Sequence, residues 1–170
     1  MNARAEIQPF RFAGIRTAPA RTIGVAVVLL LRYLMALFFL GSSLNKVAKG
    51  WLWSDYSRTV FQSRLAELDP ATFGAKFLSQ FAIPWYPLIA WVVTLSVITV
   101  TISLALGLAT RWGAALAAWL MVMFAIGGYY DASLLPLWAI AGLFIVLPTG
   151  RWFGLDRRLH ARHPASPWFR

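Results

Sequence analysis

The apolar run from Ile23 to Leu44 constrains this chain more than any other feature. It holds twenty-two residues with one full charge, Arg32, ten residues inside it. As an α-helix rising about 1.5 Å per residue, it is long enough to cross a hydrocarbon layer roughly 30 Å thick. Arg32 would then lie near mid-depth, where a charge costs about 3 kcal/mol or more unless it faces a bundle interior, a watery cavity or a ligand. The run predicts a membrane span, and the function depends on what Arg32 faces.

Three further apolar segments follow, at about 84–108, 112–130 and 134–148. The composition agrees with a membrane protein, because 59% of residues are hydrophobic and only 13% are charged, about half the charged share of soluble domains. The last segment is short, at about 21 Å of helix, so extension through Trp152 and Phe153, local bilayer thinning or a re-entrant segment would be needed. We predict an all-α integral membrane four-helix bundle over residues 22–150.

The first loop, residues 45–83, is long and predicts short amphipathic helices that lie in the membrane interface. One would run from Ser54 to Leu68. Asp69 and Pro70 would open the second, which places three phenylalanines on one stripe: Phe73, Phe77 and Phe81. An amphipathic cover over the bundle is the favoured interpretation, and a groove for a partner is the alternative.

The charges sort by side of the membrane. With four spans, the arm at 1–21, the turn at Arg111 and the tail at 151–170 share one side and carry ten Lys and Arg against two acids. The other side carries five Lys and Arg against four acids. The positive-inside rule then places both termini in the cytoplasm, and we expect a prokaryotic inner membrane. Because topology and attraction to lipid headgroups explain the net charge of +10, we predict no nucleic-acid partner.

The residue inventory excludes several kinds of redox centre. The chain has no Cys, which excludes disulfides, iron–sulfur clusters, thiolate metal sites and cysteine nucleophiles. Its two histidines, His160 and His163, lie in the tail, which excludes a haem held by a histidine pair inside the bundle. We predict no metal site. Any electron carrier must be a bound organic molecule or belong to a partner.

Arg32 shares one helix face with Ala36, Phe39, Ser43 and Lys46. No acid lies in any predicted span, so Arg32 faces a wet interior, bonds backbone carbonyls and hydroxyls, or meets an anionic or carbonyl-bearing ligand. A structural arginine and a ligand-binding arginine are equally compatible with the pattern. Lys46 lies close enough to the interface to extend its ammonium into water.

Several short motifs, each present once, follow one another in a characteristic order along the chain. Arg32 is followed by Phe38-Phe39-Leu40-Gly41 and Lys46, Trp91 stands early in the second span, and glycine motifs follow the second and fourth spans. This order resembles the DoxX/DoxD family of membrane proteins, over roughly Leu31 to Leu159. The positions of these motifs that match the family are Gly41, Gly107, Thr110, Arg111, Gly154 and Asp156.

The family includes the small membrane subunit of thiosulfate:quinone oxidoreductase. The resemblance therefore implies a membrane subunit that passes electrons from a partner, or within a homo-oligomer, to a membrane quinone. No catalytic residue is identified, and the residues expected near a quinone are Arg32, Asn45, Lys46, Trp91 and Thr94. Relatives commonly have a glutamate shortly after the tryptophan, whereas this chain reads Trp91-Val92-Val93-Thr94.

The alternative is a non-catalytic accessory subunit of a larger respiratory or photosynthetic membrane complex. The nine tryptophans, the phenylalanine stripe and the missing glutamate favour it. Transport of a small solute has less support, because no internal repeat is evident and the second span has no glycine-broken centre.

Overall fold

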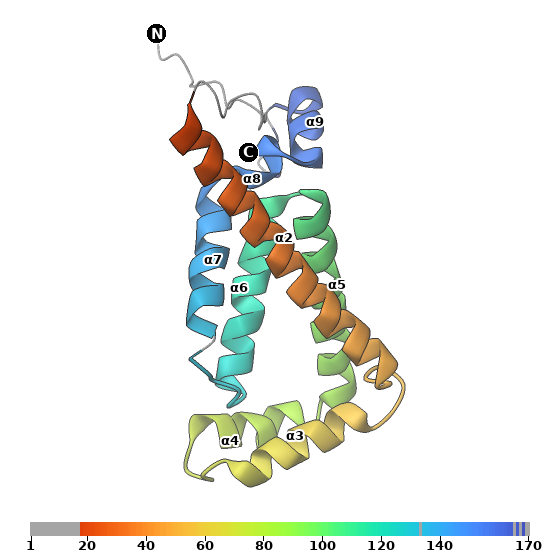
Figure 1. Cartoon of the computed structure of the whole chain (residues 1–170). Helices are drawn as coiled ribbons and strands as arrows, with labels where there is room; N and C mark the ends of the chain where they lie inside the picture. Colours follow the sequence, from red (N-terminus) through yellow and green to blue (C-terminus); the bar gives the residue numbers. More distant parts are fainter. Residues whose placement is uncertain (1–17, 133, 165, 167, 169–170) are drawn as a thin grey trace.

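The described chain is helical throughout. The computed structural model describes residues 18–132, 134–164, 166 and 168, and none of these residues forms a strand. The bundle consists of α2 (Pro19–Ala48), α5 (Tyr86–Leu106), α6 (Thr110–Ile126) and α7 (Leu134–Val146). Helix α2 crosses the other three diagonally (Figure 1). The predicted all-helical architecture is confirmed.

Short helices cover the two ends of the bundle (Figure 1). At one end, here called the platform end, lie α3 (Tyr56–Glu67), α4 (Phe73–Phe77) and the π-helix η1 (Leu78–Ala82). At the opposite end, the tail end, α8 (Thr149–Trp152) and α9 (Leu155–Arg162) pack beside the α5–α6 turn and the first half of α2. The chain between α2 and α5 therefore forms the platform, as the long first loop predicted.

Several predicted bounds differ from the observed ones. Helix α2 begins at Pro19, a favourable first-turn residue, so the end of the predicted arm is helical, and residues 1–17 lie outside the described residues. The fourth apolar helix ends at Val146. Pro148 has no N–H to continue a helix, and the chain turns there into α8. Of the three alternatives for the short fourth span, extension through Trp152 and Phe153 is therefore excluded, and local thinning and a re-entrant segment stay open.

The second platform helix begins later than predicted. It starts at Phe73 because the Thr72 hydroxyl accepts a hydrogen bond from the N–H of Ala75 at 3.3 Å. Asp69 instead closes a turn, accepting from the N–H of Ala71 at 2.9 Å. The predicted stripe does not form one buried face: Phe77 packs against the platform core, whereas Phe73 is 70% exposed and Phe81 is also exposed.

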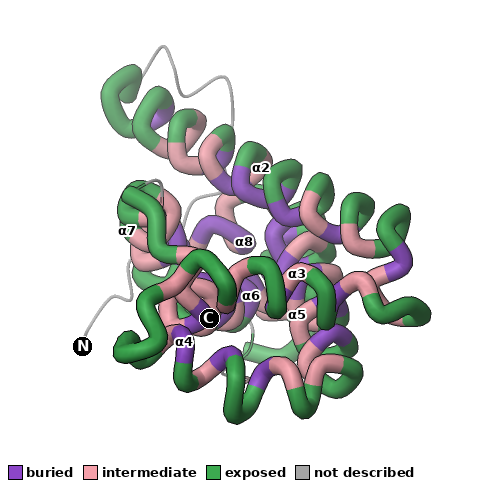
Figure 2. Tube along the Cα trace, turned by 90° about the horizontal axis from the view of Figure 1, so that it is seen from below, coloured by how far each residue is buried: buried purple, intermediate pink, exposed green. Residues whose placement is uncertain are grey.

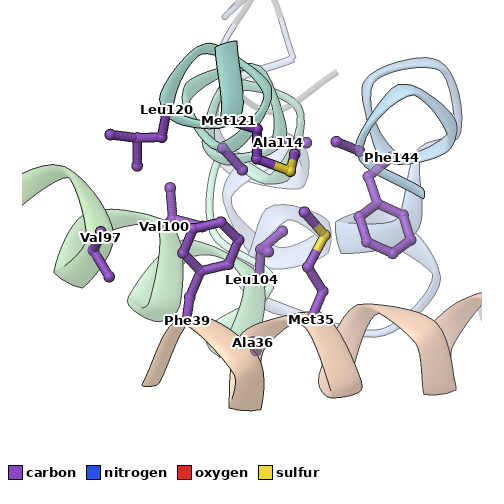
Figure 3. Packing of buried hydrophobic residues seen from close by; sticks show 12 residues of the cluster. Met35, Ala36, Phe39, Val97, Val100, Leu104, Ala114, Leu120, Met121 and Phe144 are labelled. Atoms are coloured by element: carbon purple, nitrogen blue, oxygen red, sulfur yellow. The ribbon is translucent and has the colours of Figure 1, made fainter. Parts of the chain in front are cut away.

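The bundle core is apolar and built from all four long helices (Figure 3). Small residues on α6, such as Ala114 and Ala117, let the helices approach closely. Larger side chains from the neighbouring helices fill the space between them: Met35 and Phe39 from α2, Val97, Val100 and Leu104 from α5, and Phe144 from α7. A second, smaller core of Phe61, Leu78 and Ala82 holds the platform together.

The outer surface of the bundle is strongly apolar. Along α2, large side chains such as Leu30, Leu37 and Leu44 are exposed. Figure 2 shows that the exposed positions of α2 lie mainly on its outer side, away from the other helices. Two helices, α2 and α5, are long and apolar enough to cross a membrane, yet only 28% and 33% of their most apolar windows are buried; α6 and α7 are shorter apolar helices. A core helix of a soluble protein would be mostly covered, so this uncovered apolar surface fits contact with lipid.

Candidate functional site

Arg32 is fully buried at the tail end of the bundle. Its side chain is 0% exposed. One terminal nitrogen, Nη1, donates a hydrogen bond to the backbone carbonyl of Thr149 at 2.9 Å, and Nη2 donates to the Tyr33 hydroxyl at 3.0 Å. The guanidinium also lies over the Tyr33 ring, 4.9 Å from its centroid. The sequence allowed a wet interior, bonds to carbonyls and hydroxyls, or a ligand. In the structure, Arg32 bonds to a carbonyl and a hydroxyl.

Asp156 lies next to this arginine and caps α6. Its Oδ1 accepts from the N–H of Ala109 at 2.6 Å, and its Oδ2 accepts from the N–H and the hydroxyl of Thr110 at 3.0 and 2.8 Å. A carboxylate at this position satisfies unpaired N–H groups and complements the positive end of the helix dipole. Its negative charge also attracts Arg32 electrostatically. The buried arginine is therefore partly balanced by an acid that the sequence assigned to the tail.

Glycines allow these segments to meet. Gly107 has φ +63°, and a Cβ there would lie 2.8 Å from the Gly154 Cα and 3.1 Å from Arg32 Nη1. A Cβ on Gly150 would overlap Asp156 Oδ2 and Thr110 Oγ1. We call Arg32, Gly107, Thr110, Thr149, Gly150, Gly154 and Asp156 the tail-end cluster. It joins α2, the α5–α6 turn, α8 and α9.

The level of Arg32 differs between α2 and its neighbours. The guanidinium lies beside the α5–α6 turn, at the end of α5 and the start of α6, whereas Arg32 itself lies near the middle of α2. The reason is the length of α2, whose thirty residues extend beyond the tail end of its neighbours (Figure 1). The predicted position near mid-depth of the bilayer stays a prediction.

A second polar group lies at the platform end, around Lys46. Its ammonium donates to the Ser42 hydroxyl at 2.8 Å and lies 5.7 Å from the ring centroid of Trp51 and 6.0 Å from that of Phe124. Trp51 in turn contacts Phe61 of α3 edge to face, with ring centroids 5.9 Å apart. Lys46 therefore lies between aromatic rings contributed by the platform and by α6.

Three more groups at this end have unused hydrogen-bonding capacity. The Trp51 indole N–H and the hydroxyls of Ser57 and Thr94 are buried without a partner among the described residues. Ser57 lies one turn before Phe61 on α3. Lys46 lies near the end of α2, and Thr94 lies in the first half of α5, the half that follows the platform in the chain. We call Ser42, Lys46, Trp51, Ser57, Phe61, Thr94 and Phe124 the platform-end cluster.

The five residues expected near a quinone are therefore separated. Arg32 and Lys46 lie about 21 Å apart along one continuous helix, so no single ring contacts both. Asn45 is exposed and Trp91 is 50% exposed on the outer surface. Of the five, Lys46 and Thr94 lie in the platform-side halves of their helices. The predicted single pocket does not form.

The positions of the family motifs do not all lie in one place either. Gly107, Thr110, Gly154 and Asp156 lie in the tail-end cluster, and Arg111 lies beside it, donating through Nη2 to the Val146 carbonyl at 3.0 Å. Gly41 is different. It is exposed, and an added Cβ would meet no atom within 4 Å.

The sequence did not indicate Thr149, Ser57 or Phe124 as site residues. Thr149 acts through its backbone carbonyl, which has no signature in the side-chain pattern. Ser57 follows the periodicity of its helix, and nothing in the pattern marks it as buried without a partner. Phe124 likewise follows the periodicity of α6, and only the packing of the helices brings its ring near Lys46. A signal existed for Trp51, because a tryptophan five residues after Lys46, where the chain leaves the first span, marks the interface.

Comparison with known proteins gives one match. The model of the DoxX family matches residues 27–129, which include Arg32, Lys46 and Gly107 but end before Asp156. No curated protein matches the chain. No solved structure matches it either.

Proposed function

The chain belongs to the DoxX family of membrane proteins, and from that premise we propose that it is the membrane subunit of a quinone-linked oxidoreductase. It would receive electrons from a partner protein and pass them to a membrane quinone. We assign the quinone head group to the platform-end cluster. The observation that carries this proposal is Lys46, a partly buried ammonium with one hydrogen bond in the described chain, placed between the rings of Trp51 and Phe124.

The residues of the cluster fit a quinone in kind. A quinone head is planar and carries two carbonyl acceptors, and it supplies the two-electron redox chemistry when it is bound. Lys46 and the Trp51 N–H would donate hydrogen bonds to those carbonyls, with Thr94 as a further donor. The fixed positive charge of Lys46 would stabilise negative charge that develops on a carbonyl oxygen. The aromatic rings would cover the head group and exclude water.

The proposed orientation of the protein in the membrane follows from its charges. We propose that all four long helices cross the inner membrane of a prokaryote with both termini in the cytoplasm, because Lys and Arg are concentrated in the arm, the Arg111 turn and the tail. The short length of α7 then requires local thinning of the bilayer. The platform would face the opposite compartment, and the electron-donating partner would bind there.

The test is quinone binding by the protein in nanodiscs, followed through quenching of tryptophan fluorescence by a water-soluble ubiquinone analogue. We expect Lys46→Met to weaken binding at least tenfold. Lys49→Met is the matched control, because Lys49 is exposed and contacts the Tyr56 ring instead. Equal affinities for the parent and Lys46→Met would overturn the assignment of the site. Donor-dependent quinone reduction by the complex purified from native membranes would then test the electron-transfer role itself.

A second candidate is the non-catalytic accessory subunit. Large aromatic side chains exposed on the platform favour it: Trp53, Phe73, Phe81 and Trp85. Such a protein would co-purify with a membrane complex, bind the quinone analogue no better than a lipid-only nanodisc, and leave the quinone reduction of that complex unchanged when it is removed.

A further inference from the structure

We propose that Arg111 and Arg151 at the tail end form a binding site for the phosphate of an anionic phospholipid headgroup. This site is separate from the platform-end cluster and does not depend on the proposed function. The two arginines come from different helices, α6 and α8, which meet at this corner of the bundle, because a Cβ on Gly150 of α8 would overlap Oγ1 of Thr110 at the start of α6.

The position of Arg111 is fixed by one contact. Its Nη2 donates to the carbonyl of Val146, the last residue of α7, at 3.0 Å, and this is the one hydrogen bond that its side chain makes within the described chain. Arg151 follows Val146 by five residues, and its side chain makes no hydrogen bond to another described residue. Burial, and then the positive charge of Arg111, lower the pKa of Arg151 from its ordinary value. Arg111 is anchored at the end of α7 and Arg151 lies on the short helix that follows α7, so both guanidinium groups have donors left for an anion.

No carboxylate of the described residues bonds to either guanidinium group. Asp156 is the one acid among the described residues at the tail end, and both of its oxygens are engaged by Ala109 and Thr110. The remaining charged groups of α9 add to the positive field, because they are exposed arginines: Arg157, Arg158 and Arg162. A pair of arginines without an internal counter-ion favours a bound phosphate, which accepts paired hydrogen bonds from guanidinium groups.

The surface beside the arginines identifies the source of the phosphate as a lipid. Ile145, Val146 and Phe153 are exposed apolar side chains next to Arg151 in the sequence. Trp112 follows Arg111 and contacts Trp168, with ring centroids 4.9 Å apart and the ring planes tilted by 39°, and both residues are about half exposed. Exposed tryptophans beside basic residues are typical of the headgroup level of a membrane. Acyl chains would lie along the apolar surface below the phosphate.

Native mass spectrometry of the detergent-solubilised chain tests this site. With phosphatidylglycerol as the probe, we expect the parent to retain one lipid. We expect Arg151→Gln, which leaves the Arg111–Val146 contact intact, to weaken retention about fivefold, and Arg111→Gln with Arg151→Gln to weaken it about thirtyfold, since each basic residue contributes separately. The control, Arg157→Gln with Arg158→Gln, removes the same charge from the exposed side of α9, where it contributes only to the general field, and should weaken retention much less than Arg111→Gln with Arg151→Gln does.

Two further probes distinguish the possible ligands. Phosphatidylcholine, whose headgroup is zwitterionic, should be retained at least tenfold less well than phosphatidylglycerol. Inorganic phosphate in millimolar excess should leave the bound phosphatidylglycerol in place. Equal retention of the two lipids, displacement by inorganic phosphate, or equal loss of lipid in the control variant would each overturn the proposal. A thermal unfolding curve for Arg151→Gln like that of the parent would show that lost binding is not lost folding.

Discussion

Removing the Asp156 carboxylate should destabilise the fold more than any other single change to a charged residue of the tail end except Arg32. The carboxylate accepts three hydrogen bonds at the start of α6, from two backbone N–H groups and the Thr110 hydroxyl. Asp156→Ala leaves all three donors without this acceptor in a buried place, since Asp156 is 4% exposed. It also removes the negative charge nearest to the buried Arg32.

The expected magnitude follows from these contacts. Hydrogen bonds to a charged group contribute about 1.5 to 3 kcal/mol each, but groups that share one partner are not additive. Breaking a buried charged network by removing one member costs about 3 to 5 kcal/mol. We therefore expect Asp156→Ala to lower the free energy of unfolding by about 3 to 5 kcal/mol. Asp156→Asn retains one acceptor oxygen and should lose about half as much.

The assay is reversible unfolding by sodium dodecyl sulfate in mixed micelles, followed by circular dichroism. Arg157→Ala is the matched control, because Arg157 is the exposed neighbour of Asp156 on α9 and its loss should change stability by about 0.5 kcal/mol or less. If Asp156→Ala unfolds within 1 kcal/mol of this control, the carboxylate does not hold α9 to α6, and the structural role given to the tail-end cluster is refuted.

Three further predictions concern glycine and arginine positions. Gly107→Ala should lower the free energy of unfolding by about 3 kcal/mol, because alanine at positive φ costs about 1 to 2 kcal/mol and its Cβ would lie 2.8 Å from the Gly154 Cα. Gly41→Ala, measured in the same unfolding titration, should be neutral or stabilising by up to about 1 kcal/mol, because its Cβ would meet nothing and alanine favours helix; a loss above 1 kcal/mol would contradict this. Arg64→Ala should speed amide hydrogen exchange in α3 several-fold, since it removes hydrogen bonds to the Gly128 carbonyl, one of them 3.0 Å long. Glu67→Ala, which breaks only the exposed ion pair with Arg64, should leave the exchange unchanged.

The helices were predictable because lipid imposes a simple rule on sequence. A segment that crosses or contacts hydrocarbon must be apolar and must satisfy its own backbone, so its approximate position can be predicted from hydropathy. The ends were less accurate. Pro148 ended the last helix where length alone favoured extension, and Thr72 displaced Asp69 as the cap of the second platform helix.

The candidate site was less predictable because its contacts join distant parts of the chain. Arg32 bonds a carbonyl 117 residues away, and Asp156 caps a helix that begins 46 residues earlier. Periodicity placed Arg32 and Lys46 on one face of a helix, which was correct. It could not show that Arg32 packs at the tail end of the bundle and Lys46 at the platform end. The family motifs identified Gly107, Thr110 and Asp156 together, although they gave no sign that these residues meet around Arg32.

The most direct test of the central claim is to find where a quinone contacts the chain. A photoreactive azidoquinone can be crosslinked to the protein in nanodiscs, and the labelled residues can then be identified by peptide mass spectrometry. Labels should fall on the platform-end cluster, in peptides that contain Lys46, Trp51 or Phe124, and should disappear from them in Lys46→Met. Labels concentrated around Arg32 and Thr149 instead would show that the tail-end cluster binds the quinone, which contradicts the division of roles derived from the structure.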